Sequence, residues 1–168
     1  MMLALGRIVK SERTQIIHAH NWMLHSYTPL KALHNAKFVV TLHDYSMVCA
    51  TKRLMYQNAT QCSGPALSKC LQCAPRQYGN AKGISTIFLN AFSSMAERKA
   101  VDMFLPVSRA VAEFTQLEHY RAPFQVVSNF VPSNIDTLYD DDDERLEQLP
   151  PQGYSLFVGD IRRDKGLD

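Results

Sequence analysis

The feature that most constrains the fold of this chain is an unbroken apolar run at residues 37–42, KFVVTL. β-branched and aromatic residues without polar alternation are typical of a strand that is buried on both faces of a parallel sheet. Shorter runs of the same kind occur at residues 14–19, 103–107 and 124–127. Parallel strands need long crossover connections, usually helices, and stretches with helical character separate these runs. The sequence therefore predicts an α/β fold, an incomplete Rossmann-like parallel sheet with helices on both faces.

The connections between these runs differ in how clearly they predict helices. Residues 22–35 have helical spacing, although Pro29 must kink this helix or start a second one. Residues 43–82 read as irregular, because glycine and proline punctuate them. Ser108 is suited to cap the N-terminus of a further helix. The strongest pattern opens at Gly83, where six apolar residues fall on one helical face: Ile84, Ile87, Phe88, Ala91, Phe92 and Met95.

The composition is that of a globular protein and excludes several other classes. Of the 168 residues, 46% are apolar and 20% are charged, which argues against disorder. No apolar run approaches the roughly 18 residues that a membrane-spanning helix needs, and the first residues do not resemble a secretory leader. A cytoplasmic protein is therefore expected.

Charge is distributed unevenly along the chain. Residues 1–135 contain 14 Lys and Arg against 6 Asp and Glu, a local net charge of +8, whereas residues 136–147 contain seven acids and one base. The basic excess favours an anionic partner, such as phosphate, nucleic acid or an anionic membrane surface, and a solvated basic face is the alternative. Because the basic residues are scattered and no nucleic-acid-binding motif is present, no nucleic-acid partner is predicted.

The acidic run and the prolines that follow it predict a domain boundary. Residues 1–131 form the first predicted domain, with a cysteine-rich insertion at 43–82, and residues 132–151 form an acidic linker. Residues 152–168 contribute a strand at 154–159 and the loop after it, which we expect to begin a second domain.

Polar residues follow each of the four strands predicted in the first domain, at the edge where parallel sheets bind their ligands. A His-Asp pair after the buried strand places an imidazole at this crevice, so a functional role is favoured for His43. For His18 and Asn129 taken singly, satisfaction by the backbone is favoured over function. The residues expected at this edge are His18, His20, Asn21, His43, Asp44, Ser108 and Asn129.

A second candidate site lies at residues 156–166, LFVGDIRRDKG. The predicted strand ends at Gly159, a short loop carries Arg162 and Arg163, and Lys165 opens the next predicted helix. Cations beside a helix N-terminus suit an anion such as a diphosphate. An ordinary strand-to-helix turn is the alternative, because the glycine spacing is not that of a Walker loop.

Four cysteines, Cys49, Cys62, Cys70 and Cys73, are separated by twelve, seven and two residues. Such a cluster suits a tetrahedral zinc ion, which would order a segment that has no core of its own. The C-x2-C pair is a standard half-site, whereas the Cys49 and Cys62 pair is an unusual one. Free thiols and disulfides are the alternatives. Four protein thiolates leave no open coordination position, so any metal here would be structural.

The order and spacing of six segments resemble a retaining glycosyltransferase of family 4, with the two-domain GT-B fold. The most specific matches are VTLHD at 40–44 and the valine, glycine, lysine and glycine of VGDIRRDKG at 158–166. The resemblance covers nearly the whole chain, from the middle of the family's N-terminal domain to the first strand of its C-terminal domain. The six segments are IIHAHN at 16–21, FVVTLHDYSMVC at 38–49, CLQC at 70–73, MFLPVS at 103–108, VVSNF at 126–130 and LFVGDIRRDKG at 156–166.

This resemblance implies transfer of a hexosyl group from a nucleoside diphosphate sugar to a sugar or lipid-linked acceptor, with retention and without a catalytic cofactor. His43 would then be the catalytic residue near the reacting carbon, and Lys165, with Arg162 and Gly159, would hold the donor diphosphate. A lipid-linked acceptor would bring the protein into peripheral contact with the inner face of the membrane. The cleft would be lined by His20, Asn21, Asp44, Ser108 and Asn129.

Parts of the family pattern have no counterpart in this chain. No Gly-rich loop precedes Thr14, and the family's C-terminal glutamate motif falls beyond Asp168. The family often has arginine directly after the strand-end glycine, where this chain has Asp160. The isolated chain is therefore expected to be inactive. The alternative function is that of a non-catalytic half-Rossmann module that binds a partner and has a zinc-clamped cysteine loop.

Overall fold

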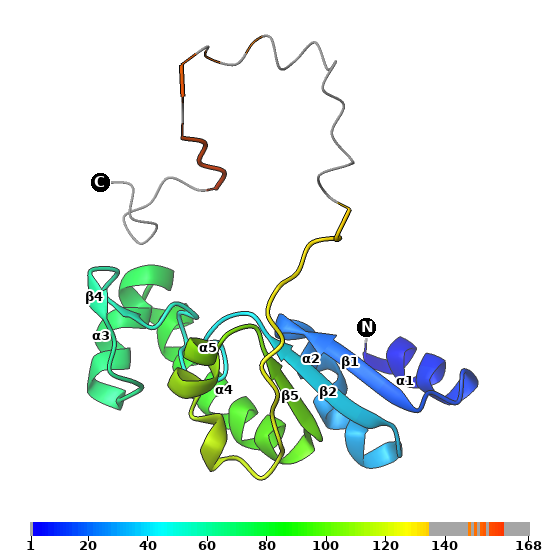
Figure 1. Cartoon of the computed structure of the whole chain (residues 1–168). Coiled ribbons are helices and arrows are strands. Elements are labelled where there is room, and N and C mark those ends of the chain that lie inside the picture. Colours follow the sequence, from blue (N-terminus) through cyan, green and yellow to red (C-terminus); the bar gives the residue numbers. More distant parts are fainter. Residues whose placement is uncertain (1, 135–147, 149, 151, 154, 160–168) are drawn as a thin grey trace. The chain divides into compact units, whose positions relative to one another are not determined.

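The computed structural model describes residues 2–134, 148, 150, 152–153 and 155–159 (Figure 1). The chain divides into two units, Met1–Ser128 and Asn129–Asp168, and the first holds the sheet and helices given below. In the second unit, residues 155–159 are exposed and form no strand. The strand predicted at 154–159 is therefore absent over its described part, because a strand is stabilised by pairing and these residues take part in no described pair.

A parallel sheet forms the centre of the first unit and confirms the predicted fold class (Figure 1). Its strands are β1 (Ile16–His20), β2 (Lys37–Leu42) and β5 (Met103–Pro106), in the order β1-β2-β5. The strand predicted at 37–42 has the predicted bounds, and it lies in the middle of the sheet. Helices flank this sheet, as expected for a Rossmann-like α/β unit.

The run predicted as a strand at 124–127 continues the sheet beside β5. Phe124 forms a parallel bridge with Phe104, and the amide of Gln125 donates to the Phe104 carbonyl at 3.0 Å. The amide of Val127 likewise donates to the Pro106 carbonyl at 3.0 Å. These bonds align the segment with β5, although it forms an isolated bridge rather than a full strand.

The connection between β1 and β2 is a broken helix, as the proline predicted. It consists of η1 (Asn21–Met23), α2 (Leu24–Tyr27) and η2 (Thr28–Leu33), and Pro29 lies in the first turn of η2. Proline has no amide hydrogen to donate, so it is tolerated at the start of the second piece and not inside a continuous helix. A helix that the sequence did not predict, α1 (Met2–Ser11), precedes β1.

The segment predicted as irregular at 43–82 contains regular structure. It folds into a hairpin of β3 (Met55–Tyr56) and β4 (Thr60–Gln61), followed by helix α3 (Leu67–Tyr78). The sequence does not predict α3, because Pro75 indicates a break there, whereas this proline lies within the helix near its C-terminal end. Gly79, with a φ of +82°, then separates α3 from α4 (Asn80–Ala100).

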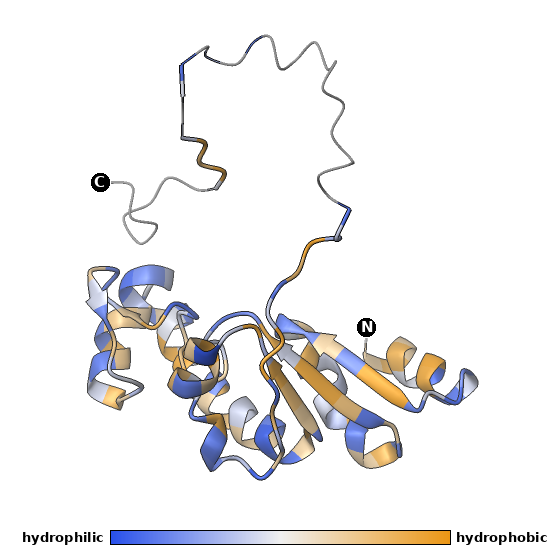
Figure 2. Ribbon diagram, in the orientation of Figure 1, coloured by the Kyte–Doolittle hydropathy of each residue, from blue (hydrophilic) through white to orange (hydrophobic). Residues whose placement is uncertain are grey.

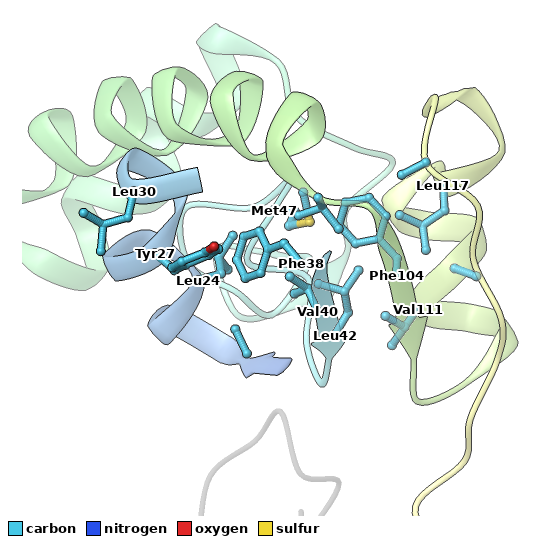
Figure 3. Close-up of a cluster of buried hydrophobic side chains, with 14 of the residues drawn as sticks. Leu24, Tyr27, Leu30, Phe38, Val40, Leu42, Met47, Phe104, Val111 and Leu117 are labelled. Carbon is cyan, nitrogen blue, oxygen red and sulfur yellow. The ribbon is translucent and has the colours of Figure 1, made fainter. Parts of the chain in front are cut away.

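The apolar core lies against one face of the sheet (Figure 3), and the strands β2 and β5 are largely hydrophobic (Figure 2). Phe38, Val40 and Phe104 are completely buried there, and Tyr27 of α2 packs edge-on against Phe38 with ring centroids 4.8 Å apart. Burial of each such side chain contributes about 1.5–3 kcal/mol. The core therefore fixes β2 against both β5 and the helical connection.

Helix α4 buries a different face from the one that its apolar spacing predicts. The apolar residues Phe88, Phe92 and Met95 are exposed, Phe92 by 77%. Ile87 of the predicted face is buried, together with Gly83, Ser94 and Glu97, which that face does not include. A β-carbon on Gly83 would lie 2.5 Å from Pro75, so its absence lets α3 pack directly on α4. Close packing through small residues and a contact from the buried Glu97 carboxylate to His25 of α2 therefore decide how α4 is oriented.

Ser108 caps the next helix, as predicted. Its hydroxyl accepts a hydrogen bond from the Val111 amide at 3.2 Å, at the start of α5 (Arg109–Thr115). A short helix, η3 (Leu117–His119), follows. Although α4 spans 21 residues, none of the described helices has the length and apolarity to cross a bilayer.

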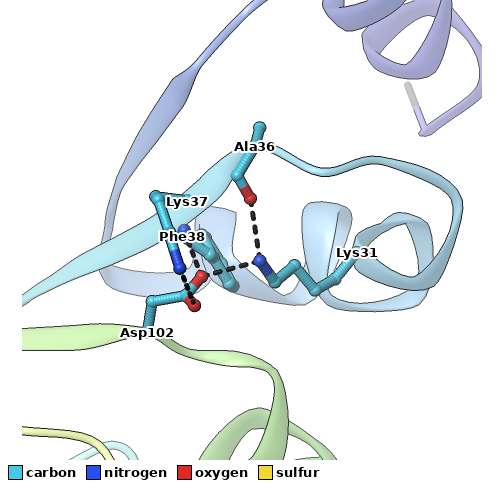
Figure 4. A network of polar contacts seen from close by, with 5 residues as sticks. All are labelled: Lys31, Ala36, Lys37, Phe38 and Asp102. Carbon is cyan, nitrogen blue, oxygen red and sulfur yellow. Dashed lines mark hydrogen bonds and ion pairs between the residues drawn. The ribbon is translucent and has the colours of Figure 1, made fainter.

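A polar network stabilises the sheet at the amino-terminal ends of β2 and β5 (Figure 4). The Asp102 carboxylate, just before β5, accepts hydrogen bonds from Lys31 Nζ at 2.6 Å and from the Phe38 amide at 2.8 Å, and pairs with Lys37 Nζ at 3.5 Å. Lys31 also donates to the Ala36 carbonyl at 2.8 Å. Partial burial acts to raise the pKa of Asp102, but these donors and the two lysine charges outweigh it and lower that pKa.

Candidate functional site

Two histidines meet at the carboxyl ends of neighbouring strands. His20 ends β1 and His43 follows β2 directly, and His20 Nδ1 lies 2.9 Å from His43 Nε2. The parallel register pairs His20 with Thr41, so strand pairing itself brings the two imidazoles together. Both side chains are exposed and can be reached by a ligand from solvent. The sequence predicted both residues at this edge, and the structure joins them by a hydrogen bond.

A third imidazole extends this pair along β1. His18 and His20 lie on the same face because strand residues two apart point the same way, and their ring centroids are 4.4 Å apart. His18 Nε2 lies 2.7 Å from the hydroxyl oxygen of the buried Thr41. His18 is therefore satisfied by a side chain of β2, where the sequence favoured satisfaction by the backbone.

The electrostatics of the cluster favour a neutral His20 ring. Partial desolvation lowers the pKa of His20 below its ordinary 6.5, and the neighbouring His18 and His43 lower it further. A hydrogen bond between two imidazoles needs one ring to donate and the other to accept. Near neutral pH, His20 is therefore an uncharged group that can donate or accept a hydrogen bond.

Asn21 and Asp44, the residues that follow the two histidines, shape the backbone at this edge. Asn21 has a φ of +49°, in the left-handed region that asparagine tolerates better than most residues. This conformation turns the chain sharply after His20. The Asp44 carboxylate accepts a hydrogen bond from the Ser46 amide at 2.8 Å, so it stabilises the turn that follows His43.

The other residues predicted for the cleft have more varied positions. The Ser108 hydroxyl is engaged in capping α5, although Ser108 follows β5 at the predicted edge. Asn129 and Gly159 are exposed and belong to the second unit. Arg162 and Lys165 lie outside the described residues.

The four cysteines line a single small cavity of about 20 Å³. All four are free thiols, and each is partly buried. Cys49 comes from the loop after β2, Cys62 follows β4, and Cys70 and Cys73 come from α3. In the conformations seen among the described residues, no group of three or more histidine, cysteine or carboxylate side chains is arranged to hold a metal ion.

A larger cavity of about 380 Å³ shares a wall with the cysteine cavity. Cys70 and Val48 line both, and Ile87, Met95 and Arg98 of α4 form the opposite side of the larger one. No sequence pattern predicts this cavity, because its lining comes from the irregular-looking segment at 43–82 and from α4, whose apolar spacing predicts a different buried face.

Comparison with known families identifies a family whose model covers most of the chain. The model of Glycosyltransferase Family 4 matches residues 1–134, which include every strand of the sheet and both histidines of the pair. No curated protein and no solved structure matches this chain.

Proposed function

The chain belongs to Glycosyltransferase Family 4, and from this premise we propose that it transfers a hexosyl group from a nucleoside diphosphate sugar to an acceptor, with retention of the anomeric configuration. Membership of the family makes the chain a glycosyltransferase domain. The donor, the transferred group and the stereochemistry belong to the proposal. They are supported by the resemblance of the segments at 40–44 and 158–166 to a retaining glycosyltransferase.

The observation that carries the proposal is the hydrogen-bonded pair of His20 and His43. The pair lies at the carboxyl edge of a parallel sheet, where α/β proteins of this kind bind their ligands. We assign His43 to the sugar or the acceptor, near the reacting carbon. The imidazole of His43 can hydrogen-bond a hydroxyl there, and the hydrogen bond with His20 holds the His43 ring in a defined orientation. The hydrogen bond made by a correctly oriented donor or acceptor becomes stronger as charge develops in the transition state.

The leaving group sets the second requirement of the reaction. As the bond to the sugar breaks, the diphosphate gains negative charge, which nearby cations stabilise. We assign this role to Lys165, with Arg162 and the backbone at Gly159. This assignment rests on the resemblance of the segment and on its cationic chemistry.

The proposed acceptor is a sugar or a lipid-linked sugar, bound at the carboxyl ends of the strands. Asn21, Asp44, Ser108 and Asn129 are proposed to line this cleft. An acceptor carried by a lipid would require peripheral contact with a membrane surface, and the net charge of +8 over residues 1–135 would favour an anionic one.

The test is a transfer assay with intact enzyme that contains this chain. Radiolabelled nucleoside diphosphate sugars are offered with sugar and lipid-linked acceptors, and the anomeric configuration of the product is determined by NMR. We expect transfer with retention from at least one nucleoside diphosphate sugar. An inverted product would contradict the proposed stereochemistry. Binding of sugar nucleotides without transfer would favour the alternative, a non-catalytic binding module.

A further inference from the structure

The segment of residues 49–79, which carries all four cysteines, has almost no apolar core of its own. Its buried residues are Thr51, Leu54 and Ala74. The continuous apolar core of the first unit stops at Met47 and resumes at Val101. The packing of this segment therefore provides little of the stabilisation that ordering some thirty residues requires.

Parts of the same segment also adopt costly backbone conformations. Lys52, Leu54, Gln57 and Asn58 all have positive φ angles, between 52° and 66°. For a bulky residue such as the buried Leu54, this region of conformational space is disfavoured. A loop of this kind persists only when its surroundings hold it in place. Contacts between its ends and α3 are the part of the structure that can do so.

Hydrogen bonds from Tyr56 to Gln72 and from Arg76 to Gln57 join the hairpin to α3, and the four cysteines lie beside these contacts. Cys49, Cys62, Cys70 and Cys73 come from three different parts of the segment, and they surround one cavity. Its volume of about 20 Å³ is the room that one water molecule or one small ion occupies. Closing this cavity with one ion would join the loop after β2, the hairpin and α3 at a single point.

We propose that Cys49, Cys62, Cys70 and Cys73 bind one Zn²⁺ ion as four thiolates in this cavity. Four thiolates at about 2.3 Å in a tetrahedral arrangement are the standard structural zinc site. Each thiol loses one proton as its bond to zinc forms, so binding to four protonated thiols releases four protons. The Zn²⁺ ion with its four thiolates then carries a net charge of −2.

The present side-chain conformations show which contacts zinc binding would replace. Three sulfur atoms contact nearby oxygen atoms: Cys49 Sγ lies 3.2 Å from Thr51 Oγ1, Cys62 Sγ 3.3 Å from the Gly64 carbonyl and Cys73 Sγ 3.6 Å from the Met55 carbonyl. Hydrogen bonds of thiols are weak. Zinc binding would require these thiols to give up these contacts and to turn toward the cavity that all four cysteines line.

The electrostatic environment changes with the ion. Four thiolates around one small cavity would repel one another. A divalent cation offsets this repulsion and holds all four sulfurs as thiolates. Lys69, which also lines the cavity, adds a positive charge beside the anionic cluster.

The site would be structural and would position the loop that leaves His43. All four coordination positions are filled by protein, so no position is left for a substrate. Cys49 is six residues beyond His43, and the intervening turn is held by Asp44. Zinc binding at Cys49 would therefore fix the far end of the short loop that begins at the His20 and His43 pair.

The experiment is metal titration of the full chain, after preparation under reducing conditions and treatment with chelator. We expect one Zn²⁺ bound per chain, release of about four protons per Zn²⁺ near pH 7, and for Co²⁺ the absorption of a tetrahedral thiolate complex. Hydrogen exchange should slow in residues 49–79 on zinc binding. These measurements use the unaltered chain, so they do not depend on whether any variant folds.

Single variants identify the ligands. Cys49→Ser, Cys62→Ser, Cys70→Ser and Cys73→Ser should each weaken zinc binding by at least about 100-fold, because removal of an outer partner of a ligand already costs about 10- to 100-fold. Ser68→Ala, at an exposed position of α3, is the control and should bind zinc normally. The proposal is overturned if the reduced chain binds no zinc, if any cysteine variant binds it normally, or if mass spectrometry of unreduced protein shows disulfides between these cysteines.

Discussion

The sheet and the cysteine segment of the same unit are stabilised in different ways. Around β2 and β5, large side chains are removed completely from solvent, Phe38 and Phe104 among them. Between residues 49 and 79, three residues are buried, and the four cysteines surround a small cavity. The sheet is thus held by apolar burial, whereas the segment that follows the candidate site relies on local contacts among polar and sulfur-bearing side chains.

Because of this difference, the position of the two histidines and the conformation of the loop after His43 depend on different parts of the molecule. His20 and His43 are placed by strand pairing, which the core stabilises, so their relation persists whatever the cysteine segment does. The loop after His43 and the cavity beyond it depend on the weaker region. Perturbations of the core should therefore affect the whole unit, and perturbations of the cysteine segment should remain local.

The largest expected effect is from Phe104→Ala, which removes a fully buried aromatic ring. We expect the free energy of unfolding to fall by about 3–5 kcal/mol, through lost burial and the cavity left behind. Denaturant titration measures this. Phe92→Ala is the matched control, since Phe92 is 77% exposed, and should change stability by no more than about 0.5 kcal/mol. Equal effects of the two variants would show that the core is elsewhere.

Gly83→Ala should come next and should act on the cysteine segment. The new β-carbon would lie 2.5 Å from backbone atoms of Pro75, so α3 must move away from α4 at a cost of about 3 kcal/mol. Hydrogen exchange should accelerate in α3 and the β3–β4 hairpin but not in β2. Gly153→Ala, where a β-carbon has no neighbour within 4 Å, is the control. Faster exchange throughout the sheet would contradict the separation of the two regions.

Asp102→Asn tests the polar network at the amino-terminal ends of β2 and β5. Loss of the carboxylate charge weakens its bonds from Lys31 and the Phe38 amide, and we expect about 2 kcal/mol of destabilisation. Because the pKa of Asp102 is lowered from 3.8, this stabilisation is present above pH 3.8 and is lost as pH falls through the lowered pKa. The difference in free energy of unfolding between the unaltered chain and Asp102→Asn, measured by denaturant titration, should therefore become smaller in that acidic range. A difference that is the same at every pH would contradict the charged network.

Ser108→Ala should cost about 1 kcal/mol, because the Val111 amide loses its capping acceptor. Ser108→Gly, which suits the same backbone position, should cost only a few tenths of this amount. Thermal unfolding of the two variants distinguishes them. If both are harmless to folding while transfer falls, the hydroxyl serves the cleft rather than the helix.

The smallest expected effect is the pH dependence of the histidine cluster. Since the pKa of His20 is lowered from 6.5, the unfolded chain binds the proton more tightly, and stability should fall slightly as pH falls below 6.5. Histidine NMR titration should give His20 a pKa below its ordinary value. A midpoint at or above 6.5 would contradict the lowered pKa of His20.

Sequence patterns predicted the parts of this molecule that depend on local chemistry. The apolar run at 37–42 gave β2 its bounds, Pro29 gave the break after α2, and Ser108 gave the start of α5. Histidines at strand ends predicted the edge at which His20 and His43 meet. In each case, burial or backbone hydrogen bonding within a few residues decides the outcome.

Sequence patterns failed to predict the features of the structure that depend on tertiary packing. The apolar spacing in α4 points to Phe88 and Phe92, yet contacts of Gly83 with α3 and of Glu97 with His25 orient the helix differently. Pro75 concealed α3. The partner of His18 on β2 depends on the strand register, which a single strand does not encode.

The most direct test of the central claim, that the histidine pair is the site of glycosyl transfer, is to measure turnover and unfolding together for His43→Ala in the intact enzyme. We predict that turnover falls by about 100- to 1000-fold, as for loss of a group that acts in the transition state. Because His43 is exposed, the free energy of unfolding should change by no more than about 0.5 kcal/mol. His119→Ala, at an exposed histidine of η3, should change neither. Near-normal turnover of His43→Ala, or a loss that merely follows unfolding, would contradict the claim.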